Sequence, residues 1–412
     1  MQTSLPQDLL QTPTGAEANR ILRTCVHCGF CTAACPTYRL LGDELDSPRG
    51  RIYLIKNLLE GREVTDRTQL HLDRCLTCRA CETACPSGVE YAHLLDIGRQ
   101  ELAGKIKRPW YHRIFFLALR LVLPYRKRFA LLLRAGQILR PLIPAPMRAA
   151  IPARNRMAVP PAVGGTHPRK VILFAGCVQP VLKPETNSAA VRVLDAIGIQ
   201  TLTAAGEGCC GAMDFHMAEP GSARKLMVNN LERWWPLIEQ GVEAIVTTAS
   251  GCGVMIRDYG YLLRDDPRYA DKAARVSALA RDISEMFTPA ERAQVRGRVR
   301  GRIAKTAFQI PCTLQHGQKL RGTRAILEDL GFPLSPASEN HACCGSAGIY
   351  SLWQRGLARR LREAKLEELS SGQPELIVTA NIGCQMHLQE RSAVPVKHWI
   401  EVVDEACRET PR

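Results

Sequence analysis

The chain has 412 residues, of which 46% are hydrophobic and 17 are cysteines, and this length allows two or three globular domains. The N-terminus lacks a basic stretch followed by an apolar one. We therefore expect no secretory signal and a reducing cytosol, where clustered cysteines bind metal or carry out redox chemistry. No stretch approaches about 18 consecutive apolar residues, which argues against a transmembrane helix. The net charge is +15, and residues 105–156 carry thirteen Lys and Arg but no Asp or Glu, so one segment holds most of the basic character.

Two matched cysteine runs occupy the N-terminal part of the chain. They read CVHCGFCTAACP from Cys25 and CLTCRACETACP from Cys75. Spacings of two, two and three residues followed by proline are typical of bacterial [4Fe–4S] ferredoxins, in which the fourth cysteine ligates the partner cluster. Zinc usually takes two Cys-x2-Cys pairs instead. The predicted ligands are Cys25, Cys28, Cys31 and Cys85 for a first [4Fe–4S] cluster, and Cys75, Cys78, Cys81 and Cys35 for a second.

The segment between the runs, SPRGRIYLIKNLLEG, places its apolar residues on one face of a helix. We therefore expect helices to separate the two cluster-binding loops, in an all-α dicluster ferredoxin domain over residues 1–100. Arg49 and Arg51 lie on this helix. They have two interpretations, as charges that offset the anionic clusters or as solvated surface charges.

Residues 101–165 form a basic segment that mixes Arg with Leu, Phe and Trp. It predicts two short amphipathic helices, broken at Pro124 and Pro141. Such helices can lie on an anionic membrane surface, dock a partner subunit, or pack as a linker on their own protein. No recognised nucleic-acid-binding motif accompanies the charge, so we expect no nucleic-acid partner.

The rest of the chain contains an internal repeat, which we divide into residues 166–300 and 301–412. In each half an apolar strand ends in a cysteine, a Cys-Cys-Gly triplet follows, and a β-branched strand leads to a last cysteine. These landmarks predict a duplicated α/β domain with its cysteines near the ends of parallel strands. The fold class is therefore α+β multidomain, with the all-α ferredoxin module first. The landmarks are Cys177, Cys209 and Cys252 in the first half, and Cys312, Cys343 and Cys384 in the second.

Each half gathers four cysteines around its Cys-Cys-Gly triplet. Two neighbouring thiolates can reach one metal centre, and the glycine lets the backbone come close. The two sets are candidates for a further iron–sulfur cluster; the alternatives are metal-free, buried cysteines and a zinc site. The sets are Cys177, Cys209, Cys210 and Cys252, and Cys312, Cys343, Cys344 and Cys384. The histidines near them are His216, His316, His341 and His387, for which a structural role competes with a cluster or quinone role.

The chain resembles the iron–sulfur subunits of bacterial glycolate oxidase (glycolate dehydrogenase) over nearly its whole length. The resemblance rests on the two cysteine runs and on segments such as TASGCG, CTLQHGQKL, CCGSAGIY and VTANIGCQMHL. It departs in one respect. In relatives with a well-defined cluster in the duplicated domain, the last cysteine is the second member of a Cys-x2-Cys pair. In this chain the first member of that pair is replaced by Ala249 in one half and by Asn381 in the other. That departure leaves four candidate ligands in each half and argues against a noncubane double cluster.

The resemblance implies an electron-transfer subunit of a hetero-oligomer. FAD-containing partner subunits would oxidise glycolate to glyoxylate, and this chain would pass the electrons to quinone or another acceptor. It also implies a cytoplasmic protein, peripheral at the inner membrane, that oxidises no substrate by itself. The chain has no dinucleotide fingerprint, which agrees with a flavin on another subunit.

Three alternatives remain at this point. One is a thiol or disulfide redox enzyme similar to heterodisulfide reductase subunits, with chemistry in the Cys-Cys-Gly domain. Another is the iron–sulfur subunit of a lactate or glycerol-3-phosphate dehydrogenase. The third, a regulatory iron–sulfur protein, lacks any recognisable effector module.

Overall fold

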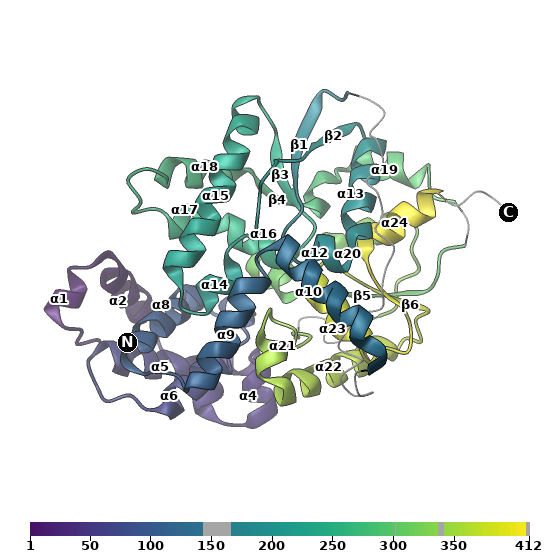
Figure 1. Ribbon diagram of the computed structural model, residues 1–412. Helices are drawn as coiled ribbons and strands as arrows, with labels where there is room; N and C mark the ends of the chain where they lie inside the picture. Colours follow the sequence, from purple (N-terminus) through teal and green to yellow (C-terminus); the bar gives the residue numbers. More distant parts are fainter. Residues whose placement is uncertain (143–165, 301, 337–341, 409–412) are drawn as a thin grey trace.

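The computed structural model describes residues 1–142, 166–300, 302–336 and 342–408 (Figure 1). Within these ranges the first part of the chain is helical, and every strand lies after residue 168, in two separate parallel sheets.

The N-terminal part is organised around the packing of α5 (Pro48–Leu59) on α8 (Tyr91–Lys105). Ser47 caps α5 by accepting a hydrogen bond from the Gly50 amide. The helices approach so closely that a Cβ on Gly98 would lie 2.6 Å from Ile55. The other elements are α1 (Gln7–Leu10), α2 (Pro13–Thr24), α3 (Phe30–Ala33), α4 (Pro36–Leu41), η1 (Glu44–Asp46), α6 (Asp66–Asp73) and α7 (Ala80–Thr83).

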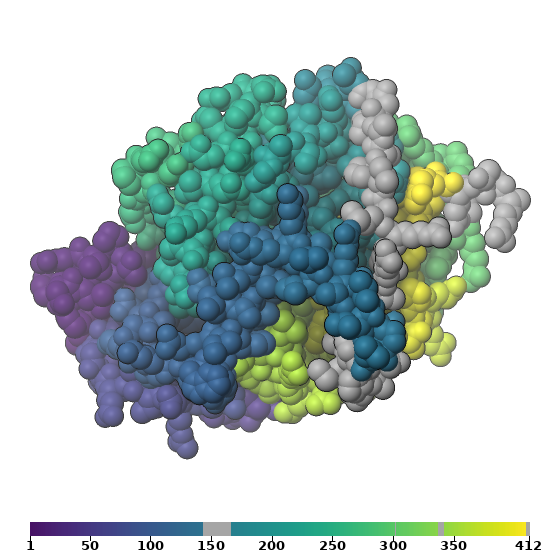
Figure 2. Space-filling view, in the orientation of Figure 1, coloured from purple at the N-terminus to yellow at the C-terminus, as the bar shows by residue number. Residues whose placement is uncertain are grey.

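The basic segment forms α9 (Trp110–Val122) and α10 (Arg126–Leu139), followed by η2 (Arg140–Leu142). The predicted helices and the break at Pro124 are confirmed, and α10 ends just before Pro141. In Figures 1 and 2 both helices lie in blue across one face of the molecule. No helix among the described residues is long and apolar enough to cross a membrane.

The first repeat carries a four-stranded parallel sheet of order β2-β1-β3-β4. Its central strands are buried, as the run of β-branched and apolar residues predicts. The strands are β1 (Arg169–Phe174), β2 (Ile199–Leu202), β3 (Ala244–Thr247) and β4 (Ala280–Asp282). The helices are α12 (Gln179–Leu182), α13 (Pro184–Ala196), α14 (Ala212–His216), α15 (Pro220–Glu239), α16 (Ser250–Arg257), α17 (Tyr259–Leu262), α18 (Ala270–Leu279), η3 (Ile283–Met286) and α19 (Pro289–Arg296).

The second repeat carries a parallel sheet of order β5-β6-β7. A single parallel bridge between Thr306 and Leu334 stands where β2 pairs with β1 in the first repeat. The strands are β5 (Thr306–Gln309), β6 (Leu376–Thr379) and β7 (Val396–His398). The helices are η4 (Thr313–Gly317), a π-helical turn, α20 (Thr323–Asp329), α21 (Tyr350–Trp353), α22 (Arg355–Ser370), α23 (Ile382–Gln389) and α24 (Trp399–Arg408).

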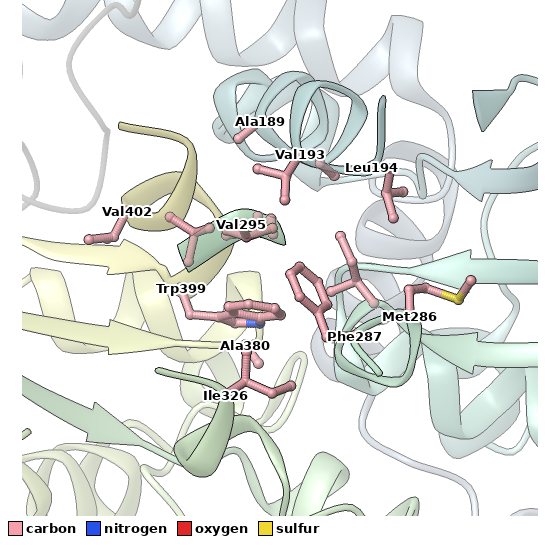
Figure 3. Close-up of a cluster of buried hydrophobic side chains, with 14 of the residues drawn as sticks. Ala189, Val193, Leu194, Met286, Phe287, Val295, Ile326, Ala380, Trp399 and Val402 are labelled. Atoms are coloured by element: carbon pink, nitrogen blue, oxygen red, sulfur yellow. The ribbon is translucent and has the colours of Figure 1, made fainter. Parts of the chain in front are cut away.

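The two repeats share a hydrophobic core at their junction (Figure 3), and each repeat also has a smaller cluster of its own. At the centre of the shared core the rings of Phe287 from the first repeat and Trp399 from the second meet edge to face, with their centroids 5.4 Å apart. Helix α24 packs on α13, where Arg192 and Asp404 form an ion pair. The repeats therefore form a single body with their sheets on either side of this core.

Candidate iron–sulfur sites

The two cysteine runs fold into loops of the same backbone conformation. His27 and Thr77, at matching positions, have φ values of 57° and 53°. The residues two positions further on, Gly29 and Arg79, have φ values of 87° and 60°. Each loop then enters a one-turn helix, α3 or α7. The matched motifs thus give matched local structure, which is what two equivalent cluster-binding loops require.

The fourth cysteine of each run lies with the three leading cysteines of the other run. Burial, together with the nearby charges of Cys25 and Cys85, raises the pKa of Cys31 to about 11. Burial likewise raises the pKa of Cys81, with contributions from Cys78, Cys75 and Cys35 among its neighbours. These neighbours are compatible with the two ligand sets that the sequence predicts, and the assignment of ligands stays a prediction.

The donor chemistry of these groups fits iron–sulfur clusters better than single zinc ions. Four thiolates around one zinc ion stand about 3.8 Å apart, given Zn–S bonds of about 2.3 Å in a tetrahedron. Among the described residues, only one group of three or more Cys, His, Asp or Glu side chains has all its ligand atoms within 4.8 Å of one another. That group is Asp43, Asp46 and His71, and it contains no cysteine. The wider cysteine groups suit a larger centre, and two arginines already occupy the Asp46 carboxylate.

A buried polar network lies against the second sulfur group. Arg51, 1% exposed, donates to the His71 carbonyl at 2.7 Å, pairs with the Asp46 carboxylate at 3.3 Å, and has its guanidinium 3.9 Å from the Cys35 sulfur. The Tyr91 hydroxyl donates to the Cys75 sulfur of the same group at 3.6 Å. Arg51 is thus a buried cation beside the site. Arg49, by contrast, pairs with Glu44 and is 37% exposed.

The cysteines of the repeats also converge, at the ends of the strands that the sequence predicts. Cys177 follows β1 and Cys312 follows β5, whereas Cys252 and Cys384 lie in the first turns of α16 and α23 rather than in loops. At a helix N-terminus the backbone dipole favours a thiolate. The triplet glycines Gly211 and Gly345 have φ values of 89° and 88°, so they permit the turn in which the paired cysteines lie.

In the second repeat the sulfurs form two close pairs. The Cys312 and Cys343 sulfurs are 3.8 Å apart, and those of Cys344 and Cys384 are 3.1 Å apart. Three of these four residues are buried; Cys312 is partly buried. In the first repeat Cys177 contacts Cys209, and Cys210 contacts Cys252, in the same arrangement.

The second cysteine run lies directly against the second repeat. Leu76 is buried in one apolar cluster with Cys343 and Tyr350, and Cys78 and Cys312 pack against that cluster. The Thr83 hydroxyl and the His316 ring are joined by a hydrogen bond of 2.9 Å. A cavity of about 40 Å³ beside Cys78 is lined by His93, Asp96, His216 and Asp258, among others; it has room for about three water molecules.

Comparisons with known proteins agree with this geometry. The family described as "4Fe-4S dicluster domain" matches residues 21–89, and the family described as "Cysteine-rich domain" matches residues 171–257 and 306–389. The glycolate oxidase iron–sulfur subunit of Escherichia coli is 53% identical over 98% of this chain and 99% of its own length. The chain belongs to the family of glycolate oxidase iron–sulfur subunits.

More distant relatives outline the breadth of the similarity. A probable glycolate oxidase iron–sulfur subunit of Bacillus subtilis is 30% identical over 89% of this chain and 88% of its own length. The lactate utilization protein A of the same organism is 23% identical over 57% of this chain. As a glycolate oxidase iron–sulfur subunit with a dicluster domain, the chain binds iron–sulfur clusters, and a count of two [4Fe–4S] clusters agrees with its family matches.

Asn381 and Ala249, which replace a possible fifth cysteine in each repeat, lie at the starts of helices α23 and α16. Asn381 stands at the N-cap position of α23 without a side-chain capping bond, and its side-chain amide lies 3.6 Å from the Cys384 sulfur, as a donor. Ala249 is buried at the start of α16. An amide donor or a methyl group supplies no thiolate, so each set keeps four sulfur donors.

The predicted histidines lie in structural hydrogen bonds. His216 contacts the Asp96 carboxylate at 3.0 Å, and His387 contacts the Ala358 carbonyl at 3.2 Å. His341 lies outside the described residues. No sequence pattern points to His93, whose ring stacks on Tyr261 with centroids 3.8 Å apart, because the two residues are far apart along the chain.

Proposed function

We propose that the chain relays electrons in a glycolate-oxidising complex, from a flavin-containing partner subunit to quinone or another acceptor. The observation that carries the proposal is the serial order of the sulfur groups. The first run reaches the surface at Cys28, and the second lies against Cys312 and Cys343. Electron tunnelling slows steeply with distance, so redox centres in a series suit a relay. The name of the Escherichia coli relative, a glycolate oxidase iron–sulfur subunit, supports glycolate as the substrate of the complex.

The proposed ligands are those that the spacing predicts. The neighbours of Cys31 and Cys81 support Cys85 as the fourth ligand of the first cluster and Cys35 as that of the second. When bound, the clusters supply one-electron steps between a two-electron donor and the acceptor. The domain limits proposed are 1–100, 101–165, 166–300 and 301–412.

The second repeat is the better candidate for a further cluster. Its four sulfurs are brought together, and two of them adjoin the second cysteine run, so a centre there would extend the series. Iron and acid-labile sulfide per chain provide the measurement: about eight irons mean two cubane clusters, and about twelve mean a third. With about twelve, Cys344→Ser is expected to lower the count by about four, whereas the matched variant Cys210→Ser is not.

The relay itself is tested with the complete complex and with the isolated subunit. Glycolate is expected to reduce the clusters only when the flavin subunits are present, as followed by EPR of the frozen mixture. Reduction of a dye by glycolate with the pure subunit alone contradicts the proposal. So does a complete complex whose clusters stay oxidised with glycolate but accept electrons from dithionite.

Thiol–disulfide chemistry on an external substrate is disfavoured by burial. Cys343 and Cys344 are 4% and 1% exposed, and Cys384 is 4% exposed. A thiolate must reach the sulfur that it attacks, so these residues offer no access to a substrate disulfide.

The basic segment is proposed to hold the complex on the cytoplasmic face of an anionic membrane. One side of α9 packs on the protein, where Phe116 and His112 contact the Trp353 ring. The opposite side exposes an apolar stripe with helical spacing, and exposed Arg113 and Lys127 lie beside it. Aromatic and aliphatic residues flanked by basic ones are typical of interfacial helices. The exposed apolar residues are Trp110, Tyr111, Ile114, Leu117 and Leu121 on α9 and Leu131, Leu132, Ile138 and Leu139 on α10.

Co-sedimentation with lipid vesicles tests this placement. The double variant Arg113→Glu/Lys127→Glu is expected to lose binding to vesicles that contain anionic lipid. The control Lys225→Glu/Arg275→Glu removes the same charge from exposed positions on α15 and α18 and is expected to bind normally. Equal binding of both double variants contradicts the proposal.

A further inference from the structure

The two cysteine runs provide an internal comparison, because they share one backbone conformation. The pairs His27 and Thr77, and Gly29 and Arg79, have matching positive φ values. Each position in the first run therefore has a structural equivalent in the second. The surroundings of the two loops nevertheless differ completely.

The loop of the second run is covered by the two repeats. Leu76 is 6% exposed and packs with Cys343 and Tyr350. The Arg79 guanidinium pairs with the Asp258 carboxylate of the first repeat. This loop therefore illustrates what covers such a site: an apolar surface with a carboxylate beside it.

The loop of the first run is open in the part of the chain that the structure describes. Val26 is 66% exposed and Phe30 is 65% exposed, whereas their equivalents Leu76 and Ala80 are 6% and 5% exposed. Between them lies Cys28, the one exposed cysteine of the 17, all of which are described. Large apolar side chains left exposed around a functional group mark an interaction site.

An arginine is available here too, although the loop itself has glycine where the second run has Arg79. The Arg49 guanidinium lies 3.0 Å from the position that a Cβ on Gly29 would take. Arg49 thus brings a guanidinium next to the loop position at which the second run has Arg79. Its present partner is Glu44, at 2.7 Å, and both side chains are partly exposed.

We infer that the loop at residues 26–30 is the docking surface for the electron-donating flavoprotein subunit, which covers Val26 and Phe30 with an apolar surface and offers a carboxylate to Arg49. The inference rests on the proposed relay and gives it a direction: electrons arrive at the first cluster, and the second passes them to the repeats. The equivalent loop of the second run is covered by folded protein that carries a carboxylate. An anionic membrane surface does not provide Arg49 with a single fixed carboxylate. The occupant is therefore a redox protein rather than a membrane.

The test uses the complete complex with Phe30→Glu or Val26→Glu in this chain. Each change puts a carboxylate into the apolar contact, so we expect association with the flavin subunits to weaken by about tenfold or more and glycolate-driven cluster reduction to slow. Iron and sulfide content and the EPR spectrum after dithionite reduction should stay as in the unmodified chain. The matched control is Leu70→Glu on α6, where the leucine is 40% exposed; it should associate and accept electrons normally.

Four outcomes decide the matter. Weakened association with intact clusters in both loop variants, and normal behaviour of Leu70→Glu, supports the inference. Normal association of the loop variants overturns it, and so does an equal loss of association with Leu70→Glu, because the effect would then not be specific to the loop. Failure of glycolate to reduce the unmodified complex overturns the proposed relay itself. Retained cluster spectra distinguish lost docking from misfolding.

Discussion

At the residue scale, Arg51 is the cation best placed to act on a cluster. Burial works to lower the pKa of Arg51, but the negative charges of Cys75, Cys35 and Asp46 among its neighbours outweigh it and raise this pKa, so the guanidinium stays charged. A buried positive charge stabilises the more negative, reduced state of an iron–sulfur centre. The sequence left the roles of Arg49 and Arg51 open, because two residues on the same helix carry the same charge and only the fold distinguishes their burial.

We expect Arg51→Gln to lower the midpoint potential of the second cluster. The change also leaves Asp46 with less compensation in the core, which costs about 3–5 kcal/mol when a buried pair is broken. EPR-monitored reductive titration gives the potential, and thermal unfolding gives the stability. Arg49→Gln is the control: it removes the same charge two residues away, at a screened site, and should shift neither quantity as much. Equal shifts for both variants contradict a specific role for Arg51.

Because His398 is buried, we expect the protein to lose stability in acid. This histidine joins the two repeats, because its ring contacts the Thr248 carbonyl at 2.8 Å, and burial lowers its pKa to about 4. Between pH 6.5 and 4 the unfolded chain takes up a proton that the folded chain resists. The free energy of unfolding is therefore highest above pH 6.5 and falls by about 3 kcal/mol as the pH drops through this window.

The difference in melting temperature between the unmodified chain and His398→Gln, followed from pH 7.5 to 4.5, isolates this contribution. Glutamine can still donate to the Thr248 carbonyl but takes up no proton. The two curves should converge in acid. Parallel curves would show that some other group causes the acid sensitivity.

At the scale of elements, the Cys-Cys-Gly turns are held against the helices that follow them. A Cβ on Gly345 would lie 2.6 Å from the Ala358 carbonyl oxygen in α22, and one on Gly211 would lie 3.1 Å from that of Ala223 in α15. Both glycines have positive φ, which costs another residue about 1–2 kcal/mol. The turns therefore tolerate no side chain, and the first repeat has slightly more room than the second.

We expect Gly345→Ala to lower the melting temperature and Gly211→Ala to lower it less. Gly356→Ala, in α22 with open space around its Cβ position, is the control and should be neutral or slightly stabilising. Differential scanning calorimetry of the three variants provides the measurement. If Gly345→Ala melts with the unmodified chain, the turn adapts and the argument from close approach is wrong.

Local patterns in the sequence predicted the elements well and their mutual contacts poorly. The spacing of apolar residues gave α5, α9 and α10, and the duplicated landmarks gave the strands that carry the cysteines, because both signals lie within one element. Cys252 and Cys384 lie in helices because the chain passes almost directly from β3 into α16 and from β6 into α23. The contact between His398 and Thr248 depends on tertiary packing over 150 residues and left no local trace.

At the scale of the molecule, the repeat was visible in the sequence but the common core of its halves was not. Matching landmarks are also expected of two independent domains in tandem. The structure instead buries Trp399 completely, in contact with Phe287 from the other repeat. Ion pairs across the same junction, such as that of Arg192 and Asp404, add specificity to the apolar contact. Neither half can bury its share of this core by itself.

Trp399→Ala should therefore destabilise both repeats together. Removing a fully buried tryptophan costs about 3–5 kcal/mol, and because the cavity opens between the halves, we expect the two to unfold in one transition at a lower temperature. Hydrogen exchange of β3 and β6 provides the readout: protection should fall equally in both strands, although only one belongs to the mutated repeat. As a control, Trp234→Ala removes an equally buried ring from the interior of the first repeat. It should reduce protection more in β3 than in β6. Loss confined to β6 in Trp399→Ala would mean that the halves fold independently despite their contact.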